Sequence, residues 1–324
     1  MGTDHGMETD LVPKAGYELR LIHAAGLKRG VSLKNIGVLL TLNKGVNECK
    51  KIIKEEKPEL LIGTGGYVTA PLMIAGVKMK VPTMIHESNA LPGKTTTWLS
   101  SKVDAVAVGF EAALEKLPKA KRAIYTGNPT KMNGLQKKED AKSKLGIGSE
   151  PFILIFGGSQ GAKKINETMV DLINTDSFNG CQIVYATGPK NYDDIMKQIK
   201  KVPENVKIER YIYNMEEMMA ASDLLVCRSG ALTTSEIGIV GVPAILIPFP
   251  YAAENHQYFN AKTLQDAGAG VILEEKDLTK ELLLDTINNL IADKAKLDEM
   301  RKNAKATGNP QAIINIEKEI ERML

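Results

Sequence analysis

Short apolar runs alternate with helix-length amphipathic segments along almost the whole chain. The runs are apolar at consecutive positions, which indicates strands buried on both faces, as in parallel sheets covered by helices. The segments between them, such as 162–173 and 190–201, have helical periodicity. The predicted strands are residues 59–63, 81–86 and 104–109 in the first part of the chain, and 152–157, 181–188, 223–227 and 243–249 in the second.

This pattern divides between two α/β domains. The 324 residues exceed what one hydrophobic core usually covers, and the Gly-, Asn- and Lys-rich stretch 127–151 indicates a hinge. We predict a first domain at 1–131 and a second at 132–324, with the last helix, 309–324, a candidate to pack back on the first domain. Open parallel sheets bind ligands at the carboxyl ends of their strands, so polar residues at those ends are the candidates for function.

The composition is that of an ordinary globular protein, with 43% hydrophobic and 25% charged residues. No apolar run approaches the roughly 20 residues that span a bilayer, and Met1 is not followed by the basic and apolar segments of a signal peptide. Three scattered cysteines favour a reducing, cytoplasmic setting. The four histidines lack the spacings typical of metal sites.

The net charge of +3 hides an asymmetry between the two domains. Residues 1–131 carry 19 Lys and Arg against 12 Asp and Glu, whereas residues 132–324 carry 23 against 27. A basic first domain indicates an anionic partner, such as a membrane surface or phosphates. Leu39, Leu40 and Leu42 lie among cations, which suits an interface with anionic lipid; the alternative is core leucines beside a solvated basic face. The cations are Lys28, Arg29, Lys34, Lys44, Lys50 and Lys51.

The segment "FGGSQG", residues 156–161, joins a predicted strand to a predicted helix. Glycines allow a sharp turn and let backbone N–H groups approach a ligand closely, and the helix N-terminus favours negative charge. A phosphate or diphosphate is the ligand that suits such a loop. The spacing is not GxGxxG, so it does not indicate a dinucleotide fingerprint. The alternative is a tight turn in which Ser159 only caps the helix.

The segment "CRSGALTTSEIG", residues 227–238, repeats this arrangement, with a helix beginning near Ala231. In a functional interpretation its amides meet a phosphate while Glu236 accepts hydrogen bonds from a ribose diol. In a structural one, Thr233 and Glu236 have the spacing of a capping box, which satisfies the helix donors without a ligand. Two such loops in one domain favour the functional interpretation.

Two further loops carry polar groups. "HESNALPG", residues 86–93, places His86 and Glu87 at the carboxyl end of a strand, where an acid–base or sugar-hydroxyl role competes with plain turn chemistry. "AAENHQYFNA", residues 252–261, gathers amide, imidazole and aromatic groups that suit sugar hydroxyls, although helix caps have the same composition.

Six motifs occur in order: "GTGGYVTAP", "HESNALPG", "TGNP", "GGSQGAKKIN", "CRSGALTTSEI" and "ENHQYFNA". Together they resemble the MurG-type N-acetylglucosaminyltransferases of peptidoglycan synthesis, over nearly the whole chain. The resemblance implies the GT-B fold: two Rossmann-like domains with parallel sheets around a cleft, and no metal or other cofactor. It implies inverting transfer of GlcNAc from UDP-GlcNAc to undecaprenyl-diphospho-muramoyl-pentapeptide (lipid I), which gives lipid II. The enzyme would act peripherally at the cytoplasmic face of the cell membrane, with an anionic lipid surface and no nucleic acid as partner.

The resemblance also assigns roles to residues. Glu236 would fix the ribose and Gln257 would contact the sugar. Of the residues present, His86 and Glu87 are the best-placed candidates for the catalytic base. The expected acceptor-side loop is Gly65, Gly66 and Tyr67. The expected donor-binding residues are Asn89, Lys131, Ser159, Ile212 through its backbone, Ala231, Leu232, Thr233, Thr234, Ser235, Glu236 and Gln257.

Two departures from the family pattern affect these expectations. The family usually has arginine after "GNP-x", where this chain has Lys131, which keeps the charge but loses the bidentate geometry. The family also opens with a strand, a "GGTGGH"-like loop and a helix, whereas residues 1–17 resemble the segment after its second strand. The first domain is therefore expected to lack roughly thirty residues, including the loop implied to hold the family's base, and to expose a sheet edge. This indicates a gene start placed too late or a truncated, weakly active chain.

Three functions remain open on the sequence. The first is the hexosaminyltransferase. The second is another GT-B enzyme, such as a diacylglycerol glycosyltransferase or a UDP-sugar epimerase, which "HESNALPG" argues against. The third is a non-catalytic UDP-sugar-binding remnant, which the missing first loop suggests.

Overall fold

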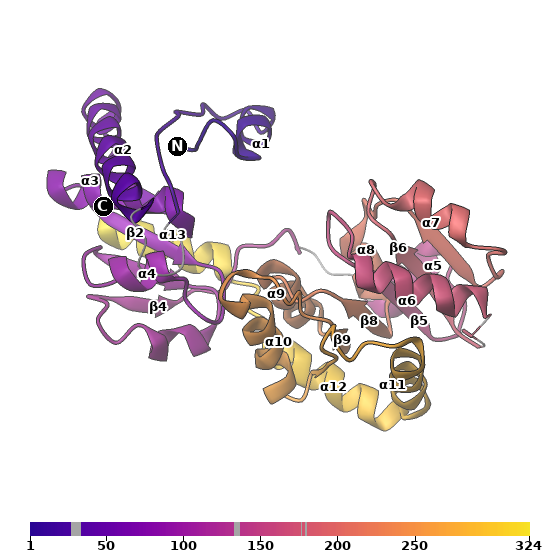
Figure 1. The fold of residues 1–324 in the computed structure, drawn as a ribbon. Coiled ribbons are helices and arrows are strands. Elements are labelled where there is room, and N and C mark those ends of the chain that lie inside the picture. Colours follow the sequence, from indigo (N-terminus) through magenta and orange to yellow (C-terminus); the bar gives the residue numbers. More distant parts are fainter. Residues whose placement is uncertain (27–33, 133–136, 176, 179) are drawn as a thin grey trace. The chain divides into compact units, whose positions relative to one another are not determined.

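The protein forms two compact units, each built on a parallel sheet (Figure 1). The first unit comprises residues 1–127 together with 313–324, and the second comprises residues 128–312. The computed structural model describes residues 1–26, 34–132, 137–175, 177–178 and 180–324. Of the predicted membrane-facing cations, Lys28, Arg29 and the side chain of Lys34 lie outside the described residues.

The first unit contains a four-stranded sheet in the order β1–β2–β3–β4, with all described pairs parallel. Its strands are β1 (Leu61–Gly63), β2 (Thr83–Glu87), β3 (Ala105–Val108) and β4 (Ala123–Tyr125). Its helices are α1 (Glu8–Lys14), α2 (Lys34–Glu56), α3 (Gly66–Met79), α4 (Lys94–Leu99), the 3-10 helix η1 (Glu111–Lys116) and α13 (Ala312–Met323).

The central strands of this sheet are buried on both faces. Met84 and Ala105 pack with Ile316 of α13 on one face. Ile85 and Val106 belong to the cluster on the other face, which includes residues of α2 and α3. Because successive residues of a strand point to opposite faces, two covered faces require the apolar runs seen in the sequence.

The final helix is fixed to the first sheet by polar contacts as well. Arg122 donates from its Nε to Glu319 Oε1 at 2.9 Å and from a terminal nitrogen to Oε2 at 3.0 Å. Asn315 Nδ2 donates to the carbonyl oxygen of Thr126 at 3.3 Å. Burial alone would raise the pKa of Glu319, but hydrogen bonds from Arg322 and Arg122 hold that pKa below its usual value. A charged carboxylate therefore anchors α13 to the strand β4 region.

The other side of this sheet is more exposed. β1 is an edge strand of the described sheet, and Ile62 at its centre is 41% exposed. α1 buries no residue and lies apart from the sheet in Figure 1, with Met7 and Leu11 exposed. This part of the first unit therefore combines an edge strand with exposed apolar side chains.

The second unit contains a six-stranded parallel sheet in the order β10–β9–β8–β5–β6–β7. Its strands are β5 (Phe152–Phe156), β6 (Gln182–Ala186), β7 (Val206–Glu209), β8 (Leu224–Cys227), β9 (Ala244–Leu246) and β10 (Gly270–Ile272). Its helices are α5 (Lys138–Leu145), α6 (Lys163–Asn174), α7 (Tyr192–Gln198), α8 (Met215–Ala221), α9 (Ala231–Val240), the 3-10 helix η2 (Ala253–Asn255), α10 (His256–Asp266), α11 (Lys280–Ala292) and α12 (Lys294–Ala306).

The stretch 127–151, predicted as a hinge, contains the helix α5. Ala141 is fully buried, and the helix packs against α8. The helix ends at Gly146, whose φ of 67° is in the left-handed region that glycine adopts without strain. With one buried position on an otherwise polar surface, such a short helix has a composition close to that of a loop.

Candidate functional site

The strand order of the second sheet indicates where a ligand is expected to bind. From β5 the chain continues to β6 on one side, whereas β8 lies on the other side of β5. The loops after β5 and β8 therefore leave the sheet in opposite directions, and open parallel sheets bind ligands at the point where they part. These loops are the two Gly-rich segments, which follow Phe156 and Cys227.

The glycines after β5 are required by a close approach between two loops. Gly161 has a φ of 76°, and a Cβ there would lie 2.1 Å from the carbonyl oxygen of Thr187. Gly188 faces it with a φ of 88°, and its Cβ would lie 2.6 Å from the backbone nitrogen of Gly161. Asn191 Nδ2 donates to the Gln160 carbonyl oxygen at 3.0 Å. The turn after β6 thus packs against the Gly-rich loop after β5 and supports it.

The helix that follows this loop has no side-chain cap. α6 begins at Lys163 after Ala162, and no side chain accepts a hydrogen bond from its first turn. Ser159 is exposed and does not cap the helix, so the structural alternative for this residue is wrong. An uncapped helix N-terminus offers backbone donors and a positive dipole end to an anion.

The helix after β8 is uncapped as well. α9 begins at Ala231 after Gly230, without a side-chain cap. The structural alternative, a capping box formed by Thr233 and Glu236, is wrong, because Thr233 lies inside the first turn and not at the cap position. Thr234 Oγ1 donates back to the Gly230 carbonyl oxygen at 3.0 Å. The N-termini of α6 and α9, neither of which has a side-chain cap, therefore follow the two strands at which the connections part.

Glu236 lies one turn into α9. Burial raises its pKa from 4.5 to about 7, and no cation is among the causes. Its neighbour Ser235 accepts a hydrogen bond of 2.9 Å from Asn128 Nδ2, which ties the "GNP" segment to the helix. A half-buried carboxyl group without a cationic partner is costly in its ionised form, which is the physical reason for the raised pKa of Glu236.

Gln257 lies in the first turn of α10 and is held from two sides. Its side-chain oxygen accepts from the backbone nitrogen of Phe249 at 2.9 Å, and its carbonyl oxygen accepts from Ser229 Oγ at 2.8 Å. The preceding residues Glu254 and Asn255 have φ of 52° and 58°. Two successive non-glycine residues in the left-handed region store strain, which is commonest at functional sites.

Arg228 connects the segment after β8 to the segment after β9, a role that was not predicted from the sequence. It is buried and donates to the carbonyl oxygens of Ile247 and Pro248, each at 3.1 Å, and it forms an ion pair with Glu275. Its guanidinium also lies 5.3 Å from the ring centroid of Phe249. This arginine fixes the segment after β9 against the segment after β8. Its position directly after a strand, before Ser-Gly, was the only signal.

The other predicted donor residues of this unit are placed as follows. Ile212 is buried in the segment between β7 and α8. Its neighbours Tyr211 and Tyr213 are exposed, and their rings make an edge-to-face contact. Leu232 is 49% exposed on the first turn of α9. Lys131 is exposed.

In the first unit, His86 and Glu87 are buried at the carboxyl end of β2. Glu87 accepts four hydrogen bonds: from the backbone and side-chain nitrogens of Asn89 at 3.0 and 3.2 Å, from Gly93 N at 3.1 Å and from Thr96 Oγ1 at 2.6 Å. His86 Nε2 lies 3.1 Å from the Gly127 carbonyl oxygen, and burial lowers the pKa of His86. These contacts organise the "HESNALPG" loop and orient Asn89.

The predicted acceptor-side loop opens α3. Gly65 and Gly66 have φ of 85° and 72°, no side chain caps the helix, and Tyr67 is 40% exposed. Thr69 Oγ1 donates to the Gly65 carbonyl oxygen at 2.5 Å. The first unit thus also presents a glycine turn and an uncapped helix N-terminus at the carboxyl edge of its sheet.

Comparison with known proteins agrees with this geometry. Residues 152–316 match the glycosyltransferase family 28 C-terminal domain, and residues 1–108 match the glycosyltransferase family 28 N-terminal domain. Over 312 residues, 95% of this chain and 85% of the relative, the sequence is 44% identical to the UDP-N-acetylglucosamine--N-acetylmuramyl-(pentapeptide) pyrophosphoryl-undecaprenol N-acetylglucosamine transferase of Acetivibrio thermocellus. The chain belongs to the MurG family of glycosyltransferases.

Further relatives support the assignment to the MurG family. The enzyme of the same name from Caldanaerobacter subterraneus is 42% identical over 322 residues, 98% of this chain and 88% of the relative. The crystal structure of Acinetobacter baumannii MurG has a TM-score of 0.81 at 27% identity and covers 99% of this chain and 89% of that one. The predicted family and the predicted GT-B fold, with two Rossmann-like domains, are confirmed.

Proposed function

We propose that this chain transfers GlcNAc from UDP-GlcNAc to lipid I, with inversion at the anomeric carbon, and so forms lipid II. The observation that carries the proposal is the pair of uncapped helix N-termini at the switch point of the second sheet, with Glu236 one turn into α9. The names of relatives at 42–44% identity favour this transferase over an epimerase or a diacylglycerol glycosyltransferase.

In this proposal the second unit binds the donor through its backbone. The first-turn amides of α6 and α9, with Ser159 and Thr233, hold the diphosphate and stabilise the charge that develops on UDP as the sugar leaves. Thr234 contributes its backbone only, because its hydroxyl is bound to Gly230. Glu236 accepts the two ribose hydroxyls. Gln257, fixed through its side-chain oxygen, presents its side-chain nitrogen to the sugar. The remaining residues predicted to contact the donor are Asn89, Lys131, Ala231, Leu232, Ser235 and, through its backbone, Ile212.

We assign Glu87 a positioning role. All four of its hydrogen-bond donors come from its own loop, and a base must instead reach the acceptor hydroxyl. The imidazole of His86 is better suited than the Glu87 carboxylate to act as a base, because its lowered pKa keeps it neutral near pH 7. Burial and the contact to Gly127 restrict its access to substrate. Gly65, Gly66 and Tyr67 are proposed to meet the acceptor diphosphate.

The positioning role predicts the effect of Glu87→Gln. An amide donates where the Gly93 and Thr96 donors need an acceptor, so we expect a loss of about 1–3 kcal/mol in the free energy of unfolding. The KM for UDP-GlcNAc is expected to rise more than kcat falls, because Asn89 loses its orientation. The measurements are chemical denaturation and steady-state kinetics, with Glu59→Gln at an exposed position as control. An unchanged stability, with loss of the acidic limb of the kcat–pH profile, would instead identify Glu87 as the base.

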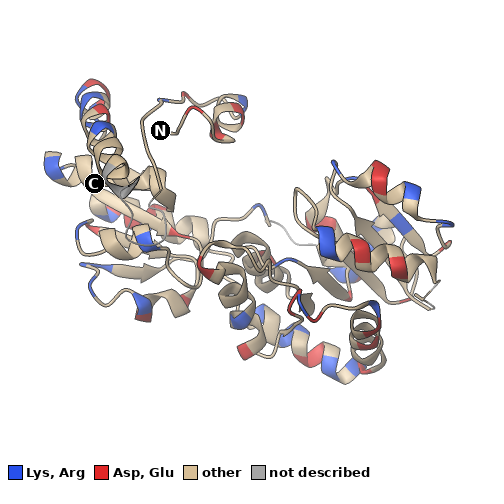
Figure 2. Cartoon of the chain, in the orientation of Figure 1, with Lys and Arg blue, Asp and Glu red and all other residues tan. Residues whose placement is uncertain are grey.

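We propose that α2 lies against an anionic membrane surface at the cytoplasmic face. Leu39 and Leu40 are 60% and 69% exposed, and Figure 2 shows charged positions spread along the same helix. Exposed leucines with flanking lysines suit interfacial binding. Among the described residues, no helix has the length and apolar character needed to cross a bilayer, so binding would be peripheral.

The function is tested by incubating the chain with UDP-GlcNAc and lipid I and identifying the products by mass spectrometry. We expect lipid II and UDP. Conversion of UDP-GlcNAc to an isomer without acceptor would establish an epimerase, and transfer to diacylglycerol but not to lipid I would establish the other transferase. Binding of UDP-GlcNAc by calorimetry without any turnover would establish the non-catalytic remnant.

A further inference from the structure

A strongly basic cavity lies in the second unit, apart from the two Gly-rich loops. Its volume is about 410 Å³, and it lies between the start of α5, the end of α9 and the last turns of α12. None of its lining residues is acidic. Five of them are cationic: Lys137, Lys138, Arg301, Lys302 and Lys305.

The cavity is at the opposite edge of the sheet from the Gly-rich loops. Lys138 and Arg301 line it, and both contact Asp223, which directly precedes β8. Asp223 also accepts a hydrogen bond of 2.9 Å from the backbone nitrogen of Phe152, the first residue of β5. The cavity is therefore near the amino ends of these parallel strands, whereas a donor bound by the Gly-rich loops would lie at their carboxyl ends.

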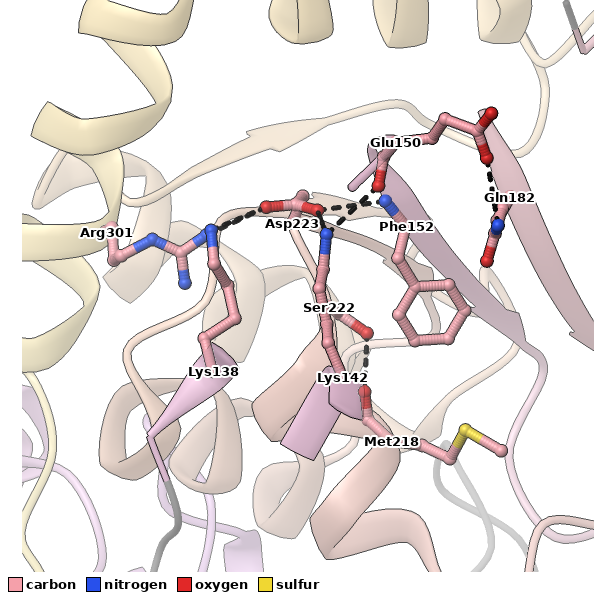
Figure 3. Close-up of polar contacts among 9 residues, drawn as sticks. All are labelled: Lys138, Lys142, Glu150, Phe152, Gln182, Met218, Ser222, Asp223 and Arg301. Atoms are coloured by element: carbon pink, nitrogen blue, oxygen red, sulfur yellow. Dashed lines mark hydrogen bonds and ion pairs between the residues drawn. The ribbon is translucent and has the colours of Figure 1, made fainter. Parts of the chain in front are cut away.

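Asp223 is one carboxylate among three cations (Figure 3). It accepts from Lys138 Nζ at 2.8 Å and from Lys142 Nζ at 2.7 Å, and a terminal nitrogen of Arg301 lies 3.9 Å away. Burial alone would raise the pKa of Asp223, but hydrogen bonds from the two lysines hold that pKa below its usual value. Asp223 is thus charged, yet a single negative charge leaves the cluster with a positive excess.

Two of the lining cations also have a structural role. Lys305 Nζ donates to the Ile239 carbonyl oxygen at 2.6 Å, and Arg301 donates to the Gly241 carbonyl oxygen at 3.4 Å. These contacts satisfy the C-terminal end of α9, where cations are favourable. They do not account for Lys137 and Lys302, which are exposed and form no ion pair within the described ranges.

We propose that this cavity binds a phosphate-class anion with at least two negative charges, at a site separate from the donor site. Its volume falls within the range of ligand pockets, roughly 300–1,000 Å³. Clustered lysines and an arginine are the side chains that bind phosphate oxygens. Repulsion among five cations around one cavity is relieved by a multivalent anion and not by a neutral ligand. The anion is a soluble diphosphate or the phosphate headgroup of an anionic lipid.

The test compares the wild-type chain with the double variant Lys137→Ala and Lys302→Ala, titrated with inorganic pyrophosphate by calorimetry. Neither lysine holds Asp223 or caps α9, so the variant is expected to fold. A second double variant, Lys200→Ala and Lys294→Ala, removes the same charge from exposed positions of the same unit outside the cavity. All titrations are repeated with saturating UDP-GlcNAc, whose own binding is measured separately.

We expect pyrophosphate to bind the wild-type chain and the control variant with UDP-GlcNAc present, and to bind the Lys137 and Lys302 variant at least about tenfold more weakly. Raising the salt concentration should weaken binding further. Equal binding by all three proteins, or complete displacement by UDP-GlcNAc, would overturn the proposal.

Vesicles distinguish the two sources of the anion. Co-sedimentation is measured with phosphatidylcholine vesicles that contain phosphatidylglycerol and with pure phosphatidylcholine vesicles. If the natural ligand is a lipid headgroup, the Lys137 and Lys302 variant binds the anionic vesicles more weakly than the control variant does. If it is a soluble diphosphate, the two variants bind these vesicles equally while still differing in their affinity for pyrophosphate. Both outcomes support an anion site in the cavity.

Discussion

Gly161→Ala is expected to lower the affinity for UDP-GlcNAc by about a hundredfold or more. A Cβ at this position would lie 2.1 Å from the Thr187 carbonyl oxygen and 2.7 Å from Asn191 Nδ2, and the φ of 76° is unfavourable for alanine. The loop can relieve both problems only by moving, and a displacement of about 1 Å at a binding loop is enough for a loss of this size. The free energy of unfolding should fall by about 3 kcal/mol. Calorimetry and chemical denaturation measure the two effects.

Gly146→Ala is the matched control for this variant. Gly146 has a similar φ of 67° in the same unit, but no atom lies within 4 Å of the point that a Cβ would occupy there. The free energy of unfolding is therefore expected to fall by about 1–2 kcal/mol, from backbone strain alone. The affinity for UDP-GlcNAc is expected to be unchanged. Equal affinities for the two variants would show that the loop after β5 does not hold the donor.

The affinity of the wild-type chain for UDP-GlcNAc is expected to rise with pH and to level off near pH 8. Burial raises the pKa of Glu236 to about 7, so the free chain carries a largely protonated carboxyl group at pH 6. The ribose diol donates best to the carboxylate, and binding must then release the proton. Affinity should therefore be about tenfold lower at pH 6 than on the plateau. UDP-GlcNAc is the appropriate probe, because the terminal phosphate of UDP itself titrates near pH 6.

Glu236→Gln is expected to remove this pH dependence and to lower the plateau affinity by about 1.5–3 kcal/mol. Its effect on stability has the opposite sign. Because the pKa of Glu236 is raised in the folded chain, folding loses stability as the pH rises from 4.5 to about 7. The glutamine variant should therefore be more stable than wild type at pH 8, although it binds the donor more weakly. A pH slope that persists in this variant would assign the titration to another group.

The strands that the sequence did not predict are all at sheet edges. β4, β7 and β10 end their sheets, and an edge strand is covered less completely than a central one. The residues of β4 are half-buried, and β7 contains an exposed lysine, Lys207. An apolar run is a signal of burial on both faces, so it identifies the central strands and, of the four edge strands of the described sheets, only β1.

The candidate site was predictable where it depends on local backbone chemistry. Glycines after a strand and before a helix identify both loops in the second unit. The capping box was a misleading signal, because its spacing is correct but the helix begins two residues before Thr233. The roles of Gly161 and Arg228 depend on loops that follow other strands. Such contacts arise from the order of strands in the sheet, and no local pattern carries that information.

The return of the final helix to the first unit has a consequence for biosynthesis. Residues 313–324 cover the face of β2 and β3 that contains Met84 and Ala105, yet they follow the whole second unit in the chain and are synthesised after it. The intervening residues 128–312 have their own sheet and core and need nothing from this helix. The nascent first unit therefore keeps an apolar face open until residues 313–324 have been made, whereas the second unit can complete its core before then.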